Sequence, residues 1–570
     1  MKLRRLEIER FRGIQKLAMD LDDLVVLIGE NNTGKTAILH ALKLCLRDLG
    51  PRRRVVFDPF DFHLKDDGSE PHSADPISVT VTFGETTANE WDAARQRRIK
   101  DIVQVDPISG LSSITLRVTC SYNAQERDFV QNWEFLNPQG QPLQGKGEQA
   151  LAALQREVAF YLLDALRDAG RNFDAKGPFW RPFLKDGQLP ADKKTEIETK
   201  LSELNELVVS SHGTFDKALE RLKKVQDLVP MQAGDVVSIE AVPGRIFDML
   251  SKAQVHLGTT TGAKVPVGRH GEGTQSLAVL MLFAAFLDLS ASSSDKDRAP
   301  LVALEEPEAH LHPSAVRTLW KTIEKVPGQK LISTHSGDLL SQVPVSAVRR
   351  LARTANGVES FHLKAGTLDA NEKRMFDFHI RHARGELLFA RCWLLGEGET
   401  EITLFQEIAR HIGIDLERAG VRCIPYRMGA SIELFLKVAR DFGIRCCALT
   451  DNDNQGQADQ VHLRNYTSAA DHAQAIHVMP EENIEGHLCA GGFGAIYQAY
   501  LTPQTQVQVT VQQGHPDYWK QVLAAIKNAK GFKKPTAALE VVEEIRAAAG
   551  AVPPLIQTAV QQAVALAGGM

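Results

Sequence analysis

The sequence predicts an α/β protein in two parts, a large head with a mixed sheet and a smaller C-terminal domain with a parallel sheet. Three observations predict this fold. An apolar run at 24–28 meets a glycine-rich loop that opens a helical pattern. Segments 77–83 and 114–120 alternate apolar and polar residues, which is typical of an antiparallel meander with one wet face. After residue 384 a pattern of strand, acidic residue and helix starts again.

The glycine-rich loop Gly29–Thr36 fits the phosphate-binding pattern G-x-x-x-x-G-K-[ST] at every fixed position. Its glycines let backbone N–H groups turn onto phosphates, Lys35 reaches the outer phosphates, and the Thr36 hydroxyl can ligate Mg²⁺. The alternative, a glycine-rich turn without a ligand, does not explain the full match between a strand and a helix. We therefore expect ATP or GTP to be bound by Gly29, Asn31, Asn32, Gly34, Lys35 and Thr36.

Composition indicates an ordinary globular chain: 570 residues, 43% hydrophobic and 24% charged, long enough for two to four domains. No signal-peptide pattern and no run of about 18 apolar residues occurs, so we expect a cytoplasmic protein that does not span a membrane. The seven cysteines are odd in number and lack metal-ligand spacing, which favours reduced core thiols.

The net charge of −5 does not by itself indicate a nucleic-acid binder. Local basic groups are consistent either with DNA contact or with a solvated face. These groups are Arg52–Arg54; Arg381, Arg384 and Arg391; and Lys527, Lys530, Lys533 and Lys534.

From about residue 147 to 228 apolar residues recur at three- and four-residue spacing, which predicts helices. The residues are Leu201, Leu204, Leu207, Val208, Leu219, Leu222, Val225 and Leu228. This segment is either a helical hairpin for dimerisation or part of the packing within one domain. A second apolar helix is expected at 276–289.

Two polar strand ends are expected to complete the nucleotide site. The apolar strand 300–304 ends in Glu305 and Glu306, which suits one carboxylate that holds Mg²⁺ through water and one that polarises an attacking water. The next strand, 330–333, leads to His335, which can sense the γ-phosphate. A lone histidine after a strand is more often structural, but this order of motifs favours the functional interpretation.

A second set of carboxylates follows the later strands. Strand 391–395 runs to Glu397, with Glu401 four residues on, so both side chains can face one point. Strand 445–450 delivers Asp451 and Asp453, which point the same way at a strand end. The strand-like run 475–479 is followed by Asn483 and Glu485.

Clustered carboxylates repel one another unless cations neutralise them, and hard oxygen ligands suit Mg²⁺ or Mn²⁺. Asp-x-Asp alone is equally consistent with a turn and with a metal site. The order of all the acidic residues together predicts a metal site with ligands for two ions. Two ions could activate a water and stabilise a leaving 3′ oxygen in phosphodiester cleavage. A positive charge from Lys533 or Lys534 would help to neutralise the phosphate during cleavage, and we choose Lys534.

The first site resembles the ABC-type ATPase head of the SMC and RecF group, and the second resembles the Toprim domain of topoisomerases, primases and certain nucleases. In the ATPase group a signature segment binds the partner's nucleotide across a dimer. The matching place here is 270–276, with Gly271 and Gly273, and it departs from the usual Ser-Gly-Gly order. Asp61–His63 lies near the place of the group's Gln-bearing lid loop.

An ABC-type head fused to a C-terminal Toprim domain resembles the domain arrangement of the OLD (overcoming lysogenization defect) family of nucleases. This family includes the Gabija-type nuclease subunit of bacterial anti-phage defence. The resemblance implies an ATP-binding, Mg²⁺- or Mn²⁺-dependent DNA endonuclease, a homodimer through the ATPase region, and nucleotide-linked control of cleavage. It also points to a helicase-like partner protein.

The expected segments are an ATPase part (1–146), a helical dimerisation insert (147–255), a second ATPase part (256–385) and a Toprim nuclease domain (386–570). The main alternative is a DNA-repair ATPase of the SMC and RecF kind with a non-catalytic Toprim domain. A topoisomerase would need an attacking tyrosine in a cleavage domain, and a primase usually needs a zinc module.

Overall fold

The computed structural model describes residues 1–50, 55–66, 68–145, 147–165, 172–173, 179, 190–211, 213–215, 240–250, 253, 255–258, 262–292, 298–355, 357–382, 385–427, 429–527, 531–547 and 552–568. The chain divides into two compact units. Unit 1 comprises Met1–Leu162, Ala299–Glu305 and Gly328–Met570, and unit 2 comprises Leu163–Arg298 and Glu306–Pro327. Several residues of the predicted helices and basic groups lie outside the described residues: Arg52–Arg54, Leu219, Leu222, Val225, Leu228, Arg384 and Lys530.

Unit 1 begins with the predicted antiparallel meander. Its sheet has the order β2-β1-β4-β6-β5, with β7 paired to β6. The strands are β1 (Leu3–Phe11), β2 (Ile14–Asp20), β4 (Ile77–Gly84), β5 (Gln104–Val105), β6 (Ser112–Asn123) and β7 (Asp128–Leu136). Alternate residues of β4 and β6 are buried in one core, as the period-2 pattern predicts.

The second sheet of unit 1 holds the phosphate loop. Its order is β14-β13-β3-β12-β11-β8, and β11, β12, β3 and β13 run parallel. The strands are β14 (Gly357–Phe361), β13 (Val348–Thr354), β3 (Leu24–Gly29), β12 (Gln329–Ser333), β11 (Ala299–Glu305) and β8 (Val158–Leu163). Because these four strands are parallel, the phosphate loop, Glu305 and the segment that carries His335 emerge at the same edge.

Strand β8 corrects the expectation that the chain is helical from residue 147 onward. Helix α3 (Glu148–Glu157) does form, but Val158–Leu163 then adds an edge strand next to β11. A short, continuously apolar run cannot be assigned to helix or strand by periodicity alone. Here the run forms a strand because it pairs with β11 at the edge of the sheet.

Short helices complete the head of unit 1. Helix α1 (Lys35–Lys43) follows the phosphate loop and buries its apolar face. The other helices are α2 (Ala93–Arg98), α10 (Gly337–Leu340) and α11 (Ala370–His382), with single turns at Leu44–Asp48, Pro59–Asp61, Pro71–Ser73, Val345–Ala347 and Glu386–Phe389.

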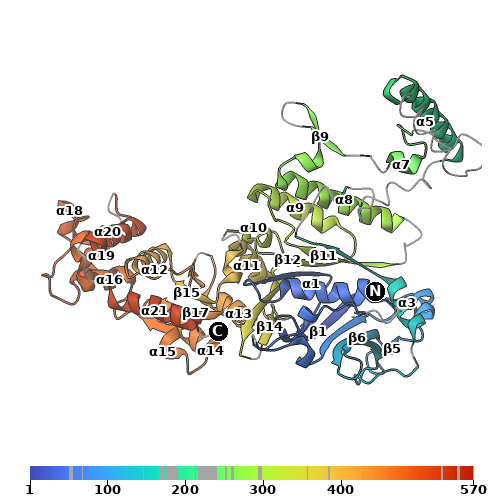
Figure 1. Ribbon diagram of the computed structural model, residues 1–570. Helices are drawn as coiled ribbons and strands as arrows, with labels where there is room; N and C mark the ends of the chain where they lie inside the picture. The colour runs from blue at the N-terminus through green and yellow to red at the C-terminus, as the bar shows by residue number, and fades with distance from the viewer. Residues whose placement is uncertain are drawn as a thin grey trace, which may run out of the picture. The chain divides into compact units, whose positions relative to one another are not determined.

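The C-terminal part of unit 1 is the predicted parallel sheet, with the order β16-β15-β17-β18 (Figure 1). The strands are β15 (Cys392–Gly396), β16 (Val421–Pro425), β17 (Arg445–Thr450) and β18 (Ile476–Val478). The helices and turns are α12 (Glu399–His411), α13 (Ile432–Phe442), α14 (Asn454–Tyr466), α15 (His472–Ala475), α16 (Ile484–Leu488), Cys489–Phe493, α17 (Gly494–Gln498), α18 (Pro503–Gln506), α19 (Tyr518–Ile526), α20 (Lys534–Ala547) and α21 (Pro554–Gly568).

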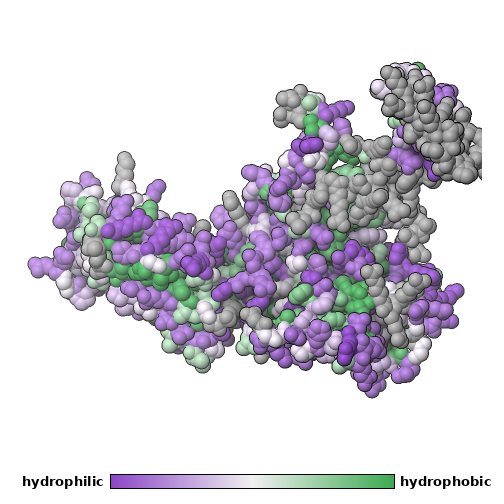
Figure 2. All heavy atoms as spheres, in the orientation of Figure 1, coloured by the Kyte–Doolittle hydropathy of each residue, from purple (hydrophilic) through white to green (hydrophobic). Residues whose placement is uncertain are grey.

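Helices cover both faces of this sheet, and its two central strands are buried over most of their length. Leu394 and Cys447 face a core shared with α12, α20 and α21. On the other face Trp393 packs against Phe376 of α11 and Phe435 of α13. The visible surface around this core is mainly hydrophilic, with a hydrophobic strip in its middle (Figure 2).

Unit 2 contains α5 (Ala191–Ser211), α7 (Ile246–Leu250), α8 (Glu272–Ser292) and α9 (Pro313–Lys325), with the short pair β9 (His256–Gly258) and β10 (Lys264–Pro266). Helix α5 confirms the predicted helix over Leu201–Val208, and α8 confirms the apolar helix at 276–289. Within the described ranges, one segment, Glu272–Ser290, is apolar and long enough to cross a membrane. One such helix is weak evidence of a membrane span, since core helices meet the same criterion.

Candidate functional site

The predicted carboxylates gather at the carboxyl edge of the C-terminal sheet. Glu397 follows β15, Asp451 follows β17, and Glu485 lies on α16, which comes after β18. Parallel strands bring these ends to one edge. The proximity has an electrostatic effect, because the charges of Glu397, Glu401 and Glu485 all raise the pKa of Asp451.

Burial makes this charge accumulation costly. Loss of solvent raises the pKa of Asp451 to about 8, with the neighbouring carboxylates adding to the shift. Loss of solvent also raises the pKa of Glu397 to about 7, although Arg427 opposes the change. Burial raises the pKa of Glu401 above its usual range. The edge of this sheet therefore holds more negative charge than its own cations neutralise.

Unsatisfied oxygens are consistent with a divalent cation here. The Oδ1 atom of Asp451 is buried and accepts no hydrogen bond. The Oε1 atom of Glu485 also accepts none, although it lies 2.9 Å from Nζ of Lys534 in an ion pair. A buried acceptor without a partner, such as Asp451 Oδ1, is costly, and a hard cation with oxygen ligands would satisfy it. The residues present therefore fit Mg²⁺ or Mn²⁺.

Three of the predicted ligands already cap helices. Glu401 Oε2 accepts from Gly398 N at 2.9 Å, Asp453 Oδ1 accepts from Gly456 N at 2.6 Å, and Asn483 Oδ1 accepts from Gly486 N at 2.9 Å. These bonds fix the side chains at helix starts and leave further lone pairs. In the described part of the chain, no three of the predicted carboxylates bring one oxygen each within 4.8 Å of one another.

Helical spacing does not explain the approach of Glu397 and Glu401. Helix α12 begins at Glu399, so Glu397 lies before the helix and not one turn below Glu401. The strand end positions Glu397, and the helix start positions Glu401.

Gly456 permits the turn that aims Asp451. A Cβ atom at Gly456 would lie 2.0 Å from the carbonyl oxygen of Asp451, so the start of α14 packs directly on that backbone. Only glycine fits this approach without a shift of the chain.

Three residues that the sequence analysis missed hold Glu397 in place. Arg427 lies 2.5 Å from Glu397 Oε2 and 3.1 Å from Asp459 Oδ2. The Tyr426 hydroxyl donates to Asp459 at 2.9 Å and lies 3.4 Å from Glu397 Oε1. Tyr426 and Arg427 directly follow β16, so the rule that polar residues at parallel strand ends converge could have found them.

The phosphate loop at the edge of the second sheet forms internal hydrogen bonds. Lys35 Nζ donates to the carbonyl oxygens of Gly29 and Glu30, at 2.8 Å in both cases. The Thr36 hydroxyl donates to Glu305 Oε1 at 2.5 Å. The predicted Mg²⁺ ligand and the predicted acidic strand end are therefore in contact, although 269 residues separate them.

Backbone geometry supports the glycine pattern of this loop. Gly29 and Gly34 have φ angles of 149° and 95°, and a Cβ atom at Gly29 would lie 2.4 Å from the Leu351 carbonyl oxygen. Asn32 has a φ of 64°, and its carbonyl oxygen accepts from Arg353 at 2.8 Å. Asn31 and Asn32 are exposed, as nucleotide-contacting residues need to be.

The other predicted residues of the nucleotide site lie after strand ends, at the start of α8 and in a buried ion pair. His335 is exposed two residues after β12, and Glu306 follows β11 with a left-handed φ of 41°. In unit 2, Gly271 and Gly273 flank the first residue of α8, and a Cβ atom at Gly273 would lie 2.7 Å from the His310 carbonyl oxygen. Asp61 is buried in an ion pair with Arg12 at 2.8 Å, which is a structural role.

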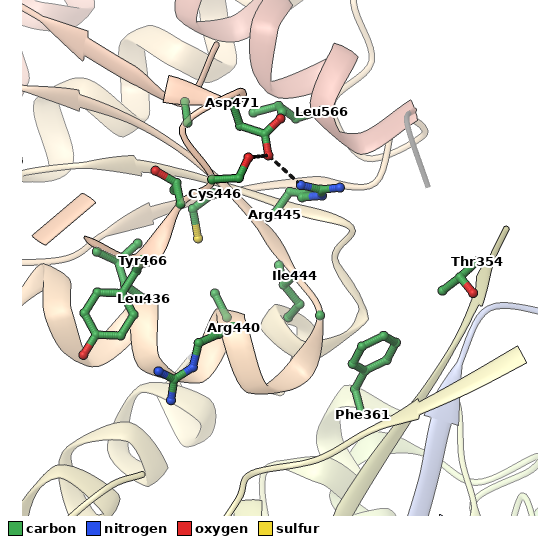
Figure 3. A pocket seen from close by; sticks show the side chains of 15 residues that line it. Thr354, Phe361, Leu436, Arg440, Ile444, Arg445, Cys446, Tyr466, Asp471 and Leu566 are labelled. Atoms are coloured by element: carbon green, nitrogen blue, oxygen red, sulfur yellow. Dashed lines mark hydrogen bonds and ion pairs between the residues drawn. The ribbon is translucent and has the colours of Figure 1, made fainter. Parts of the chain in front are cut away.

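A cavity of about 330 Å³ lies at the opposite end of the C-terminal sheet (Figure 3). It is lined by Arg440, Arg445, Cys446, Tyr466 and Asp471, and Arg445 pairs with Asp471 at 2.8 Å. Arg445 begins β17 whereas Asp451 follows its end, so the two are roughly 20 Å apart along the strand. This cavity is therefore separate from the carboxylates.

Two family models match the chain. Residues 1–386 match the family described as "Protein of unknown function (DUF2813)", and residues 388–453 match "Overcoming lysogenization defect protein-like, TOPRIM domain". The chain belongs to the DUF2813 family and carries an OLD-type TOPRIM domain. The resemblance to the OLD family that the motifs indicated is thus confirmed.

Curated OLD-family and related proteins are similar over most of their length. The chain is 27% identical to "Uncharacterized protein YbjD" of Escherichia coli (strain K12) over 100% of both chains. It is 25% identical to "OLD nuclease" of Thermus scotoductus, over 79% of this chain and 82% of the relative. It is 22% identical to "Endonuclease GajA" of Bacillus cereus, over 80% and 75%.

Among solved structures, the chain is similar to an SMC head bound to the C-winged helix domain of ScpA. The match covers 64% of this chain and 99% of the SMC head chain. The TM-score is 0.37 and the identity is 14%.

Proposed function

We propose that this protein is a divalent-metal-dependent DNA endonuclease whose ATP-binding head regulates cleavage. The main support is the carboxylate edge, where Asp451 Oδ1 is buried without a hydrogen bond among like charges. The OLD-type TOPRIM domain and relatives named as nucleases support the same reaction class.

Glu397, Glu401, Asp451, Asp453, Asn483 and Glu485 would hold the metal. Bound Mg²⁺ or Mn²⁺, in a two-ion site, supplies water activation and stabilises the leaving 3′ oxygen. Arg427 keeps Glu397 oriented, and Lys534, paired with Glu485, offers a positive charge for the phosphate that is cut. Lys534 is more than half exposed, so it can turn between Glu485 and a substrate.

ATP would bind at the phosphate loop, with Thr36 and Glu305 sharing the Mg²⁺ of the nucleotide. Glu306 would polarise the attacking water and His335 would sense the γ-phosphate, while Gly271 and Gly273 would contact a second copy's nucleotide. Leu204 and Leu207 are exposed on α5, which supports a homodimer through the ATPase region. The proposed function also includes the expected domain boundaries, a cytoplasmic location, a role in anti-phage defence and a helicase-like partner protein.

Plasmid cleavage tests this function. We expect purified protein to nick or cut supercoiled plasmid with Mg²⁺ or Mn²⁺, and to fail with Ca²⁺ or with chelator. Asp451→Asn keeps the size of the side chain and removes the charge, so it should abolish cleavage. Full cleavage by Asp451→Asn would favour the alternative, a DNA-repair ATPase with a non-catalytic TOPRIM domain.

A further inference from the structure

An ion pair joins the phosphate loop to the TOPRIM sheet. Glu30, the second residue of the loop, accepts from Arg391 through both carboxylate oxygens, and the contact of Arg391 Nη2 with Oε2 measures 2.7 Å. Such a bidentate pair fixes the relative orientation of its two side chains as well as their distance. The pair lowers the pKa of Glu30, so the carboxylate stays charged at neutral pH.

Arg391 is part of the TOPRIM sheet. It directly precedes β15, its N–H donates to Gly420 at 2.8 Å, and its carbonyl oxygen accepts from Arg445 at 2.9 Å. Glu397 follows the other end of the same strand. A strand of five residues therefore connects the partner of Glu30 to a predicted metal ligand, over roughly 20 Å.

Arg350 makes a second connection between the same regions. It lies on β13, which pairs with the phosphate-loop strand β3. Its buried guanidinium donates to the carbonyl oxygens of Ala390 and Phe442, at 3.0 Å in both cases. The residues just before β15 therefore make two contacts with the nucleotide-binding part, Ala390 with Arg350 and Arg391 with Glu30, and the Arg391 pair is the contact that involves the loop itself.

Nucleotide binding must alter this arrangement. Lys35 now donates to the carbonyl oxygens of Gly29 and Glu30, and it has to leave them to reach the outer phosphates. Added phosphates also repel the Glu30 carboxylate. A cavity of about 160 Å³, lined by Glu30, Arg350, Arg353 and Arg391 among others, gives the side chain of Glu30 room to move.

We propose that the Glu30–Arg391 pair transmits the nucleotide state of the loop through β15 to the metal-binding edge. This inference rests on the proposed function, because it requires that the loop bind ATP and that the carboxylates hold metal. Two sites that bias one element are coupled in both directions, usually by about 5- to 150-fold in affinity.

Hydrogen exchange with and without ATP tests the pair without relying on cleavage. In the wild type we expect ATP to change exchange in peptides covering 29–40 and also in peptides covering 390–401. In Arg391→Gln the first change should remain and the second should disappear. Arg391→Lys, which keeps the charge and loses the bidentate geometry, should give an intermediate response at 390–401.

A matched control is Arg422→Gln. Among the described residues, Arg422 forms ion pairs with Glu386 and Glu417, at 2.9 Å in both cases, and none with the phosphate loop. The side chains of Arg422 and Glu386 are about as exposed as those of Arg391 and Glu30. This variant should respond to ATP as the wild type does. In cleavage assays, a nucleotide effect of at least about fivefold in the wild type should fall below about twofold in Arg391→Gln.

The outcomes separate the inference from the proposed function. No response to ATP at 29–40 in the wild type would contradict ATP binding itself. A response at 29–40 without one at 390–401 would overturn the inference and leave the proposed function standing. An unchanged response at 390–401 in Arg391→Gln would overturn it as well.

Discussion

The two predicted sites differ in how far their polar groups are satisfied within the chain. At the phosphate loop, Lys35 donates to two carbonyl oxygens and Thr36 donates to Glu305. At the TOPRIM edge, Asp451 has a buried oxygen without a hydrogen bond and a pKa raised by burial and by neighbouring carboxylates.

This difference indicates different responses to ligands. Strand ends and helix starts fix the backbone of the carboxylate edge, so a cation has only to draw in the side chains and thereby relieve their repulsion. The phosphate loop must give up internal bonds before it binds phosphates. A site that has to rearrange is suited to switching, and a site that is already positioned is suited to chemistry.

Metal binding at the TOPRIM edge should depend strongly on pH. Because the pKa values of Asp451 and Glu397 are raised to about 8 and about 7, these groups hold protons that a cation must displace. Affinity for Mn²⁺ should therefore rise with pH, by roughly 10- to 100-fold between pH 6.5 and 8.5. Calorimetry on the Lys35→Ala protein, at both pH values, measures this affinity. Equal affinities would show that Asp451 and Glu397 are already ionised at the lower pH and that their pKa values are not raised.

Lys35→Ala sharpens the contrast between the sites. The variant loses the positive charge that reaches the outer phosphates, so ATP affinity should fall by about 10- to 100-fold. Mn²⁺ binding at the TOPRIM edge should stay within about twofold of the wild type, since Lys35 follows a strand of a different sheet. Fluorescent-nucleotide titration and calorimetry measure the two affinities. Parallel loss of both would contradict separate sites.

Arg427→Gln tests whether the charge balance around Glu397 matters for cleavage. The variant removes ion pairs to Glu397 and Asp459 and leaves both carboxylates without their cation. Cleavage should fall by about 10-fold, as for residues that orient metal ligands. Arg410→Gln is the control, because Arg410 is exposed and pairs with Glu407 on the same helix, α12. Equal rates for the two variants would argue against a positioning role of Arg427.

Gly456→Ala has the smallest expected effect and tests local packing. The added Cβ would lie 2.0 Å from the Asp451 carbonyl oxygen, so the chain must shift at the turn. We expect a loss of about 1–3 kcal/mol in stability, seen as a lower midpoint of chemical unfolding. Gly491→Ala, where nothing lies within 4 Å of the added Cβ, should change little. Equal midpoints would mean that the turn is not constrained.

Strand ends were the most predictable feature of both sites. Apolar runs followed by glycine or acidic residues marked β3, β11, β15 and β17, and the structure places those ends as expected. Periodicity over a strand is a local property, so it survives without knowledge of the fold. The choice of Lys534 over Lys533 is supported by the ion pair of Lys534 with Glu485.

Contacts between distant segments could not be predicted. Glu30 and Arg391 are 361 residues apart, and nothing near either residue marks the other as its partner. The place of Arg427 directly after β16 was predictable as a polar strand end, but its pairing with Glu397 was not, because that pairing depends on β16 and β15 being neighbours in the sheet. Strand β8 was missed because a short apolar run fits a buried helix and a buried strand equally well.

Comparison of two carboxylates on one helix turn tests the central claim most directly. Glu401 is buried and Glu399 is exposed, and both lie in the first turn of α12. In Mn²⁺-dependent plasmid cleavage, Glu401→Gln should lower the rate by roughly 10²–10³-fold, whereas Glu399→Gln should leave it nearly unchanged. Cleavage by Glu401→Gln at the rate of the wild type would contradict the assignment of the TOPRIM edge as the nuclease site.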